Sequence, residues 1–243
     1  MNDSGGEREG KGGRSHRRTI MRAALAVGAI IFDFNGTLSN DEPILCEIFC
    51  ELFAEHGRPL SAQQYFDELA GLSDEDIVRT WLGGNHPAVD EVIEQRLARY
   101  NARVVDGSTV PDVVRAAVRY AAERVPIAIV SGAAHAEIAA VIEAAGFDGL
   151  FATVVAAEDV EEGKPDPAGY LRALEILDCG LRAEDVLVFE DTEAGIASAK
   201  AAGMRCVAVL GTLAPERLAA ADEVVPAIDI ELMQRLLADD ALQ

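Results

Sequence analysis

Five side chains that could do chemistry together stand just after short apolar runs or in a loop between two of them: Asp33, Ser131, Lys164, Glu190 and Asp191. The three carboxylates would make an oxygen-rich site of the kind that binds a hard dication such as Mg²⁺. That dication and the Lys164 ammonium would neutralise a phosphate placed beside a carboxylate. Asp33 could then attack phosphorus in line and form an aspartyl-phosphate, while Ser131 donates a hydroxyl hydrogen bond. The residue types therefore indicate phosphoryl-transfer chemistry.

The stretch around Asp33 indicates where this chemistry would lie. The run AVGAIIF at 26–32 is apolar and rich in β-branched residues, which is typical of a strand buried on both faces of a parallel sheet. Ligands of such sheets bind beyond the carboxyl ends of the strands, where Asp33 stands. Gly36 allows a sharp turn there. We assign the hydroxyl-bearing Thr37, and Gly132 beside the predicted phosphate site, to substrate binding.

An alternative for this stretch is a β-hairpin, because Asn35-Gly36 is a strong turn signal. A hairpin requires an alternating apolar strand after the turn. The residues at 39–43 are Ser-Asn-Asp-Glu-Pro, which is typical of a loop and a helix start. The pattern therefore favours a strand that ends at Asp33.

The segment that follows Asp106 alternates between helical and strand patterns. Strands are predicted at 127–130, 153–156, 186–189, 206–209 and 224–225, and helices at 111–123, 134–145, 169–177 and 195–202. This alternation predicts an α/β fold with a parallel sheet and right-handed crossovers. The predicted catalytic groups would then meet at one edge of the sheet. Each group alone is a weak signal, and their order and placement after strands carry the inference.

The segment 41–104 has a helical pattern instead. Apolar residues recur at three- and four-residue spacing between 44 and 53, and Asn40 or Asp41 could cap this helix. Further helices are predicted at 62–69, 73–82 and 87–102. Because this helical insert directly follows the Asp33 loop, we expect it to form a lid over the site.

Composition excludes several classes of partner. The 243 residues include 21 basic and 42 acidic side chains, with a formal net charge of -21, which argues against a nucleic acid partner. An anionic substrate would have to be held by local cations. Half of the residues are hydrophobic, so the chain can bury a sizeable core. No apolar run is long enough to span a membrane, and we expect no membrane partner.

The remaining signals concern the cysteines and the first residues. Four cysteines, Cys46, Cys50, Cys179 and Cys206, suit a reducing cytoplasm, where we expect them to be buried thiols. Residues 1–23 are rich in Gly, Ser, Arg and Lys without an apolar period, which predicts a disordered tail. Arg17-Arg18 before an apolar run superficially resembles an export signal. We reject export because cleavage after that run would remove Asp33.

Four motifs in order, DFNGTL, IVSG, GKPDP and FEDTEAGIASAKAAG, resemble those of the haloacid dehalogenase-like (HAD) hydrolase superfamily. The chain is most similar to its β-phosphoglucomutase-like and phosphoglycolate phosphatase-like branch. The resemblance implies a Rossmann-like core at 24–40 and 105–243 and an inserted all-helical cap at 41–104. It also implies a small phosphorylated metabolite as substrate and Mg²⁺ as cofactor. The pattern fixes neither the natural substrate nor the oligomeric state.

The resemblance also implies roles for single residues. Asp33 would be the nucleophile, and Ser131 and Lys164 would hold the phosphoryl group. Mg²⁺ would be held by Asp33, Glu190, Asp191 and the backbone carbonyl of Asn35. These roles place Asp33, Asn35, Ser131 and Lys164 in the catalytic site.

One departure lies inside the first motif. Phosphatases and mutases of the superfamily usually carry Asp two positions after the nucleophile as a general acid and base, and this chain has Asn35. An amide does not titrate usefully, and loss of such a group typically removes roughly 10²–10⁴ in rate. Substrates with good leaving groups, such as acyl or aryl phosphates, would suffer least. An alternative is therefore a binding or regulatory protein of the same fold with weakened catalysis.

A second departure lies in the cap. Mutase-like members often carry Arg after the Ser of the stretch Gly71-Leu72-Ser73, where this chain has Asp74. This argues against a mutase, which must hold a second phosphate, unless Arg79 substitutes. We expect His135 to be structural or exposed to solvent. Dehalogenase chemistry is disfavoured by the acidic pair at 190–191. Phosphonate hydrolysis is disfavoured by the lack of a lysine between residues 38 and 106.

Overall fold

A computed structural model of the chain describes residues 27–177 and 180–238. A six-stranded parallel sheet with the order β3-β2-β1-β4-β5-β6 forms its centre. The strands are β1 Ala29–Phe32, β2 Ile127–Val130, β3 Thr153–Val155, β4 Val186–Glu190, β5 Arg205–Val209 and β6 Glu223–Val225. The α/β class with a Rossmann-like parallel sheet is thereby confirmed. The predicted tail at 1–23 and Cys179 lie outside the described residues.

Strand β1 occupies the middle of the sheet and is buried along its whole length. Ile30 pairs with Ile127 of β2 on one side and with Leu187 of β4 on the other. Because successive strand residues point to opposite faces, Ile30 and Phe32 enter one hydrophobic core and Ile31 enters the other. The central strand that ends at Asp33 is therefore held rigidly from both faces.

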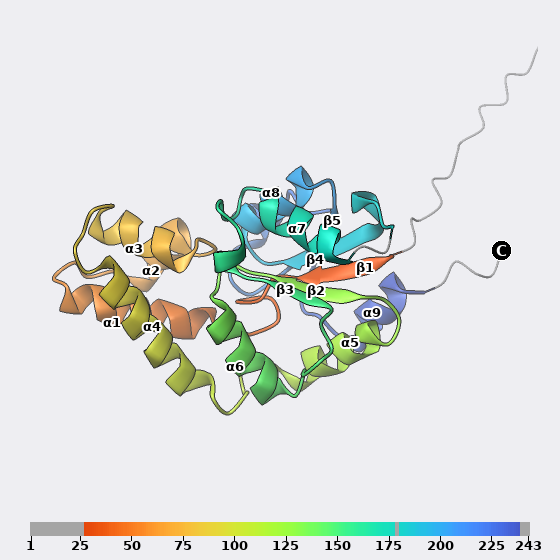
Figure 1. The fold of residues 1–243 in the computed structure, drawn as a ribbon, viewed down its shortest axis with the longest axis horizontal. Helices are drawn as coiled ribbons and strands as arrows, with labels where there is room; N and C mark the ends of the chain where they lie inside the picture. Colours follow the sequence, from red (N-terminus) through yellow and green to blue (C-terminus); the bar gives the residue numbers. More distant parts are fainter. Residues whose placement is uncertain (1–26, 178–179, 239–243) are drawn as a thin grey trace, which may run out of the picture.

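Helices cover both faces of the sheet, with α7 and α8 on one side and α5, α6 and α9 on the other (Figure 1). Their bounds are α5 Asp112–Ala122, α6 His135–Ala145, α7 Ala168–Leu177, α8 Glu193–Ala201 and α9 Ile230–Leu236. Helix α9 has no counterpart among the sequence-based predictions. Short 3₁₀ turns lie at Ala157–Asp159, Ala183–Asp185 and Pro215–Leu218.

The fully described segment between β1 and α5 contains helices and turns and no strand. These helices are α1 Glu42–Glu55, α2 Ala62–Gln64, a π-helix Tyr65–Leu69, α3 Asp74–Leu82 and α4 Val89–Val104. Figure 1 shows them as a separate layer beyond the end of the sheet, with α4 adjoining α6. We keep 41–104 as the proposed cap and 24–40 with 105–243 as the proposed core.

Three local expectations differ from the structure. Strand β1 covers Ala29–Phe32, where it pairs with β2 and β4, and not the whole apolar run at 26–32, of which residue 26 lies outside the described residues. The helix predicted at 62–69 changes to a π-helix at Tyr65, whose carbonyl accepts from the Ala70 N–H at 2.9 Å. Asp41 occupies the N-cap position of α1, but its side chain makes no cap bond because it binds Tyr100 and Asn35 instead.

The thiols of Cys46, Cys50 and Cys206 are free, and Cys46 and Cys206 are buried. Within residues 27–177 and 180–238, no helix has both the length and the apolar character needed to cross a membrane.

Candidate active site

The site begins with three carboxylates at the carboxyl ends of the two central strands. Asp33 follows β1, Glu190 ends β4, and Asp191 comes next. Because β1 and β4 are parallel and Phe32 pairs with Phe189, Asp33 and Glu190 lie beside each other. One oxygen of each of the three carboxylates lies within 4.8 Å of the others, and all three residues are buried.

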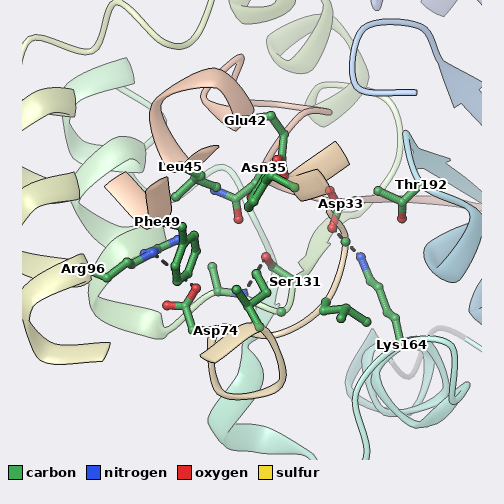
Figure 2. Close-up of a pocket in the computed structure, with 16 residues that line it drawn as sticks. Asp33, Asn35, Glu42, Leu45, Phe49, Asp74, Arg96, Ser131, Lys164 and Thr192 are labelled. Carbon is green, nitrogen blue, oxygen red and sulfur yellow. Dashed lines mark hydrogen bonds and ion pairs between the residues drawn. The ribbon is translucent and has the colours of Figure 1, made fainter. Parts of the chain in front are cut away.

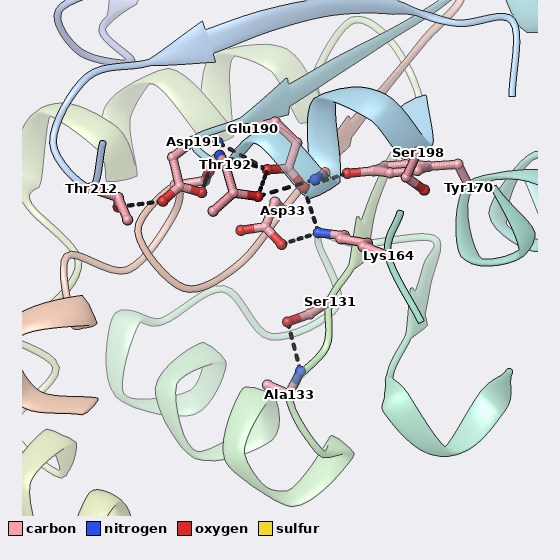
Figure 3. A network of polar contacts seen from close by, with 12 residues as sticks. Asp33, Ser131, Ala133, Lys164, Tyr170, Glu190, Asp191, Thr192, Ser198 and Thr212 are labelled. Atoms are coloured by element: carbon pink, nitrogen blue, oxygen red, sulfur yellow. Dashed lines mark hydrogen bonds and ion pairs between the residues drawn. The ribbon is translucent and has the colours of Figure 1, made fainter. Parts of the chain in front are cut away.

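Lys164 reaches this cluster from the loop after β3. Its ammonium forms ion pairs with Asp33 Oδ1 and with Glu190 Oε1, the latter at 2.5 Å (Figure 3). Burial raises the pKa of Asp33 to about 7, although Lys164 opposes the shift. Burial also lowers the pKa of Lys164, but Asp33 and Glu190 outweigh it and hold that pKa above its usual range. Lys164 therefore stays charged beside the nucleophile.

Hydroxyl and amide donors fix the orientation of the acidic pair. Glu190 Oε2 accepts from the Asp191 N–H at 3.0 Å and from the Thr192 hydroxyl at 3.1 Å. Asp191 accepts from the Thr37 hydroxyl at 2.9 Å and from the Thr212 hydroxyl. The structure thus places Thr37, predicted to bind substrate, against Asp191. The hydroxyl of Thr37 orients a cluster carboxylate.

The three carboxylates meet the requirements of a hard divalent cation. Their oxygens form a compact, buried, all-oxygen donor set, which such ions prefer. Burial raises the pKa of Asp191 far above its usual range, and the neighbouring Asp33 and Glu190 add to the shift. The single ammonium of Lys164 leaves negative charge over in the cluster. A dication would balance that charge, so the donor set fits one.

Ser131 and Gly132 face the cluster from the end of β2. The Ser131 N–H donates to Val155 at 3.0 Å, and its hydroxyl oxygen accepts from the Ala133 N–H at 3.0 Å. Figure 3 shows Ser131 on the far side of Lys164 and Asp33 from the acidic pair. Ser131, Gly132, Lys164 and Asp33 line one chamber, which we call the inner chamber, with a volume of about 40 Å³. The predicted phosphate-binding groups therefore meet around one small space.

Residues of the proposed cap form a large part of the remaining wall of this chamber (Figure 2). Phe49 of α1 and Tyr65 supply aromatic walls, and Glu42, Asp74 and Arg96 supply charged groups. The described lining thus combines core residues that suit phosphoryl chemistry with cap residues that would contact a leaving group.

Asn35 is clamped between two carboxylates. Its Nδ2 donates to Glu137 Oε1 at 3.0 Å and to Asp41 Oδ2 at 3.2 Å. Each acceptor is held in turn from α4, Glu137 by the Arg96 guanidinium and Asp41 by the Tyr100 hydroxyl. The Asn35 amide therefore acts as a double donor, a role that a carboxyl group cannot fill, because even when protonated it has a single O–H to donate.

Sequence reasoning missed Arg96 and Glu137, although both leave a signal. Arg96 is spaced by four residues from Val92 and from Tyr100, so it interrupts the apolar face of a helix. Glu137 is an acid one turn before Val141 on the buried face of helix α6. Arg96 also pairs with Asp74, with 3.2 Å between Nε and Oδ1. A cation therefore lies beside Asp74 after all, supplied by α4.

Arg79 and His135 lie outside the inner chamber. Arg79 pairs with Glu75 on the surface, so it does not supply the missing cation at Asp74. His135 is half exposed and contacts Asp159 at 2.7 Å. This agrees with the expectation that His135 is structural or exposed to solvent.

Comparison with known proteins gives relatives over most of the chain. The sequence profile of the haloacid dehalogenase-like hydrolases matches residues 30–209. Validoxylamine A 7'-phosphate phosphatase of Streptomyces hygroscopicus subsp. limoneus is 31% identical over 209 residues, covering 79% of this chain and 90% of that protein. Protein CbbY of Rhodobacter capsulatus is 32% identical over 196 residues, covering 75% and 85%.

The fold is also similar to that of solved structures. A crystal structure of a CbbY mutant from Rhodobacter sphaeroides in complex with xylulose 1,5-bisphosphate superposes with a TM-score of 0.75 at 25% identity. The match covers 85% of this chain and 96% of that one.

Proposed function

Because the chain belongs to the haloacid dehalogenase-like hydrolase family, we propose that it is a Mg²⁺-dependent phosphatase. Its substrate would be a small phosphorylated metabolite, hydrolysed through an aspartyl-phosphate on Asp33. One observation carries the proposal. The buried Asp33 carboxylate shares a chamber with Lys164 and Ser131 and lies within 4.8 Å of the Glu190 and Asp191 carboxylates.

Each core residue has a defined part in this chemistry. A carboxylate oxygen of Asp33 forms a bond to phosphorus while the bond between phosphorus and the ester oxygen breaks. Lys164 and the Ser131 hydroxyl hold the phosphoryl oxygens during this transfer. Water then forms a bond to phosphorus while the bond between phosphorus and the Asp33 oxygen breaks. The protons of this water leave with inorganic phosphate, and the Asp33 carboxylate is restored.

The metal would be held by Asp33, Glu190 and Asp191 with the backbone carbonyl of Asn35. When bound, Mg²⁺ supplies positive charge that offsets the negative charge of the phosphoryl group. Thr37 and Thr212 fix the orientation of Asp191 and so prepare this site.

Asn35 orients groups and transfers no proton. Both N–H bonds of its amide are used by Glu137 and Asp41, so its carbonyl oxygen is left to accept a hydrogen bond. An alkyl alkoxide leaving group would therefore leave slowly. Acyl and aryl phosphates, whose leaving groups need little protonation, are the better substrates.

The alternative of a binding or regulatory protein has less support. Asn35 motivates it, but nucleophile, cation and acidic cluster are all present around one chamber. A protein that only binds phosphate has no need of a buried carboxylate beside the phosphorus position.

Hydrolysis of p-nitrophenyl phosphate and acetyl phosphate, with and without Mg²⁺, tests the proposal. We expect metal-dependent release of phosphate that falls to background in Asp33→Asn. Asp112→Asn is the matched control, because the Asp112 side chain is fully exposed. Phosphate release retained in Asp33→Asn, or absent from the wild type with both compounds, would overturn the phosphatase function.

A further inference from the structure

The cations that border the site are already paired. A wider chamber of about 510 Å³ adjoins the inner one, and both are lined by Asp74, Ser131, Gly132 and Lys164. Among the described residues that line either chamber, the basic ones are Lys164 and Arg96. Lys164 pairs with Asp33 and Glu190.

Arg96 is similarly occupied. Its side chain is 2% exposed and pairs with Glu137 and Asp74. A second anionic group on a substrate would therefore meet no unpaired cation in the described lining. Such a group would lose its hydration without gaining a countercharge.

Whereas both of these cations are paired, the acidic residue Glu42 has no described cation within ion-pair distance. It begins α1, is 6% exposed and lines the inner chamber together with Asp33. Its Oε2 accepts from the Tyr65 hydroxyl at 3.1 Å, and no described residue donates to Oε1 or forms an ion pair with the carboxylate. Figure 2 shows the Glu42 side chain directed toward Asn35 and Asp33. The residue is thus a buried acid at the chamber wall that has no ion-pair partner among the described residues. Burial raises its pKa, and the Arg96 charge lowers that pKa only slightly against the effect of burial.

Aromatic rings stand on the same side of the chamber. The Phe49 and Tyr65 rings both line it and stack with 6.1 Å between their centroids. The faces of aromatic rings attract cations, and ammonium groups are commonly bound between rings and a carboxylate. The Arg96 guanidinium, 6.0 Å from the Phe49 centroid, already contacts that ring, so a protonated amine would be held mainly by Glu42.

The wider chamber is lined by negatively charged side chains, as is the wall of the inner chamber at Glu42. Its lining contributes acidic side chains that form no ion pair with a described residue, and these are Asp76, Glu158, Glu161, Glu162 and Asp166. Glu75 also lines this chamber and is paired with Arg79. The wider chamber, with its volume of about 510 Å³, is typical in size of a pocket for a drug-sized molecule. It can therefore accept a leaving group larger than a triose. A positively charged leaving group is drawn into this space, and an acidic one is repelled.

We propose that the substrate is a phosphate monoester whose leaving group carries a protonated amine and no second anionic group. This inference rests on the phosphatase function proposed above. The amine lies against Glu42, Phe49 and Tyr65, while the phosphoryl group lies at Asp33. Bisphosphates and phosphorylated carboxylates are poor substrates, because the site offers them no free cation.

Three phosphate esters of matched size but different charge test the inference. They are O-phosphoethanolamine, 2-hydroxyethyl phosphate and 2-phosphoglycolate, which place an amine, a hydroxyl or a carboxylate at the same distance from phosphorus. We expect kcat/KM for the amine to exceed that for the hydroxyl by about 10- to 100-fold, as for a hydrogen bond between charged groups. The carboxylate should be the poorest of the three. For any ester that turns over too slowly, its inhibition constant against p-nitrophenyl phosphate replaces kcat/KM.

Variants on one helix locate the effect. Glu42→Gln keeps an acceptor for the Tyr65 hydroxyl but cannot carry a negative charge. At about pH 9, above the value of about 8 to which burial raises the Glu42 pKa, the ratio of kcat/KM for the amine to that for the hydroxyl should therefore fall to near one. Glu47→Gln is the matched control, because the Glu47 side chain is 71% exposed on the same helix. It should keep the wild-type ratio.

The outcomes separate the two proposals. Metal-dependent hydrolysis of p-nitrophenyl phosphate without preference for the amine would overturn the substrate class and leave the phosphatase function standing. A preference that survives in Glu42→Gln would overturn the role of Glu42. No hydrolysis of p-nitrophenyl phosphate or acetyl phosphate would overturn the function and this inference with it.

Discussion

Replacing Asn35 by Asp would restore the residue that phosphatases of the family usually carry, but in this chain the Asn35 side chain lies between two buried carboxylates. The Asn35 amide donates to Asp41 and Glu137. In Asn35→Asp both donors disappear, and a carboxylate stands about 3 Å from two others. One of the three groups must then hold a proton.

The magnitude follows from those two contacts. A hydrogen bond to a charged acceptor contributes roughly 1.5–3 kcal/mol, so the loss of both would cost about 3–6 kcal/mol. Burial already raises the pKa of Asp41, and a further carboxylate raises it more. A carboxyl whose pKa is raised by folding loses stability as pH rises above its unfolded value near 4. Asn35→Asp should therefore lose about 3 kcal/mol or more at pH 8 and clearly less at pH 5.

Urea denaturation of a double-mutant cycle measures this. Glu137→Gln offers an amide donor to Asp at position 35, so the double variant Asn35→Asp/Glu137→Gln should be more stable than the sum of the single changes by at least about 1 kcal/mol. The proton retained near residue 35 should also speed alkyl phosphate turnover by about 10²-fold. Equal stability of Asn35→Asp and wild type at pH 8, or additive single changes, would refute the reasoning.

Three further predictions concern the carboxylates and the glycine beside them. Burial raises the Glu42 pKa from 4.5 to about 8, so the stability of the wild type falls as pH rises through that range. In urea denaturation without metal, the free energy of unfolding of Glu42→Gln relative to the wild type should therefore rise by roughly 3–4 kcal/mol between pH 5 and 8. A difference that stays constant over this range would contradict the prediction. Mg²⁺ at 100 times its Kd should raise the free energy of unfolding, followed by thermal denaturation, by about 3 kcal/mol, and Asp191→Asn should lose this effect. Stabilisation by Mg²⁺ that is retained in Asp191→Asn would exclude Asp191 as a ligand. A Cβ on Gly195 would overlap the Glu190 carboxylate, so Gly195→Ala should lose Mg²⁺-dependent turnover, whereas Gly84→Ala, with open space around it, should keep it; equal activity of the two would show that Glu190 can move.

Much of the core could be predicted because the signals are local. Short apolar runs indicated the strands, and β2 spans the residues predicted for it. Parallel strands end at the same edge, so the expected meeting of Asp33 with Glu190 and Asp191 needed only strand ends and topology. The helix α9 escaped prediction because it is short and follows a weak strand signal.

The partners of Asn35 could not be predicted in the same way. Glu137 is 102 residues away in the chain and reaches Asn35 only because α6 packs beside the end of β1. Arg96 lies on α4 and forms ion pairs with Glu137 and Asp74. Sequence spacing identifies neighbours along a helix or across paired strands, and it carries no such rule for contacts between layers.

The sequence by itself determined the α/β core, the family, and which catalytic groups follow which strands. These features could be predicted because motifs and hydrophobic periodicity are properties of short stretches of sequence. Only the tertiary structure decided that Thr37 donates a hydrogen bond to Asp191 and that Asn35 is a double donor. It also decided that Glu42 is a buried acid with no ion-pair partner among the described residues. These facts depend on which side chains share a desolvated space, where each polar group must find a partner. That space is defined by helices and strands packing across the whole chain.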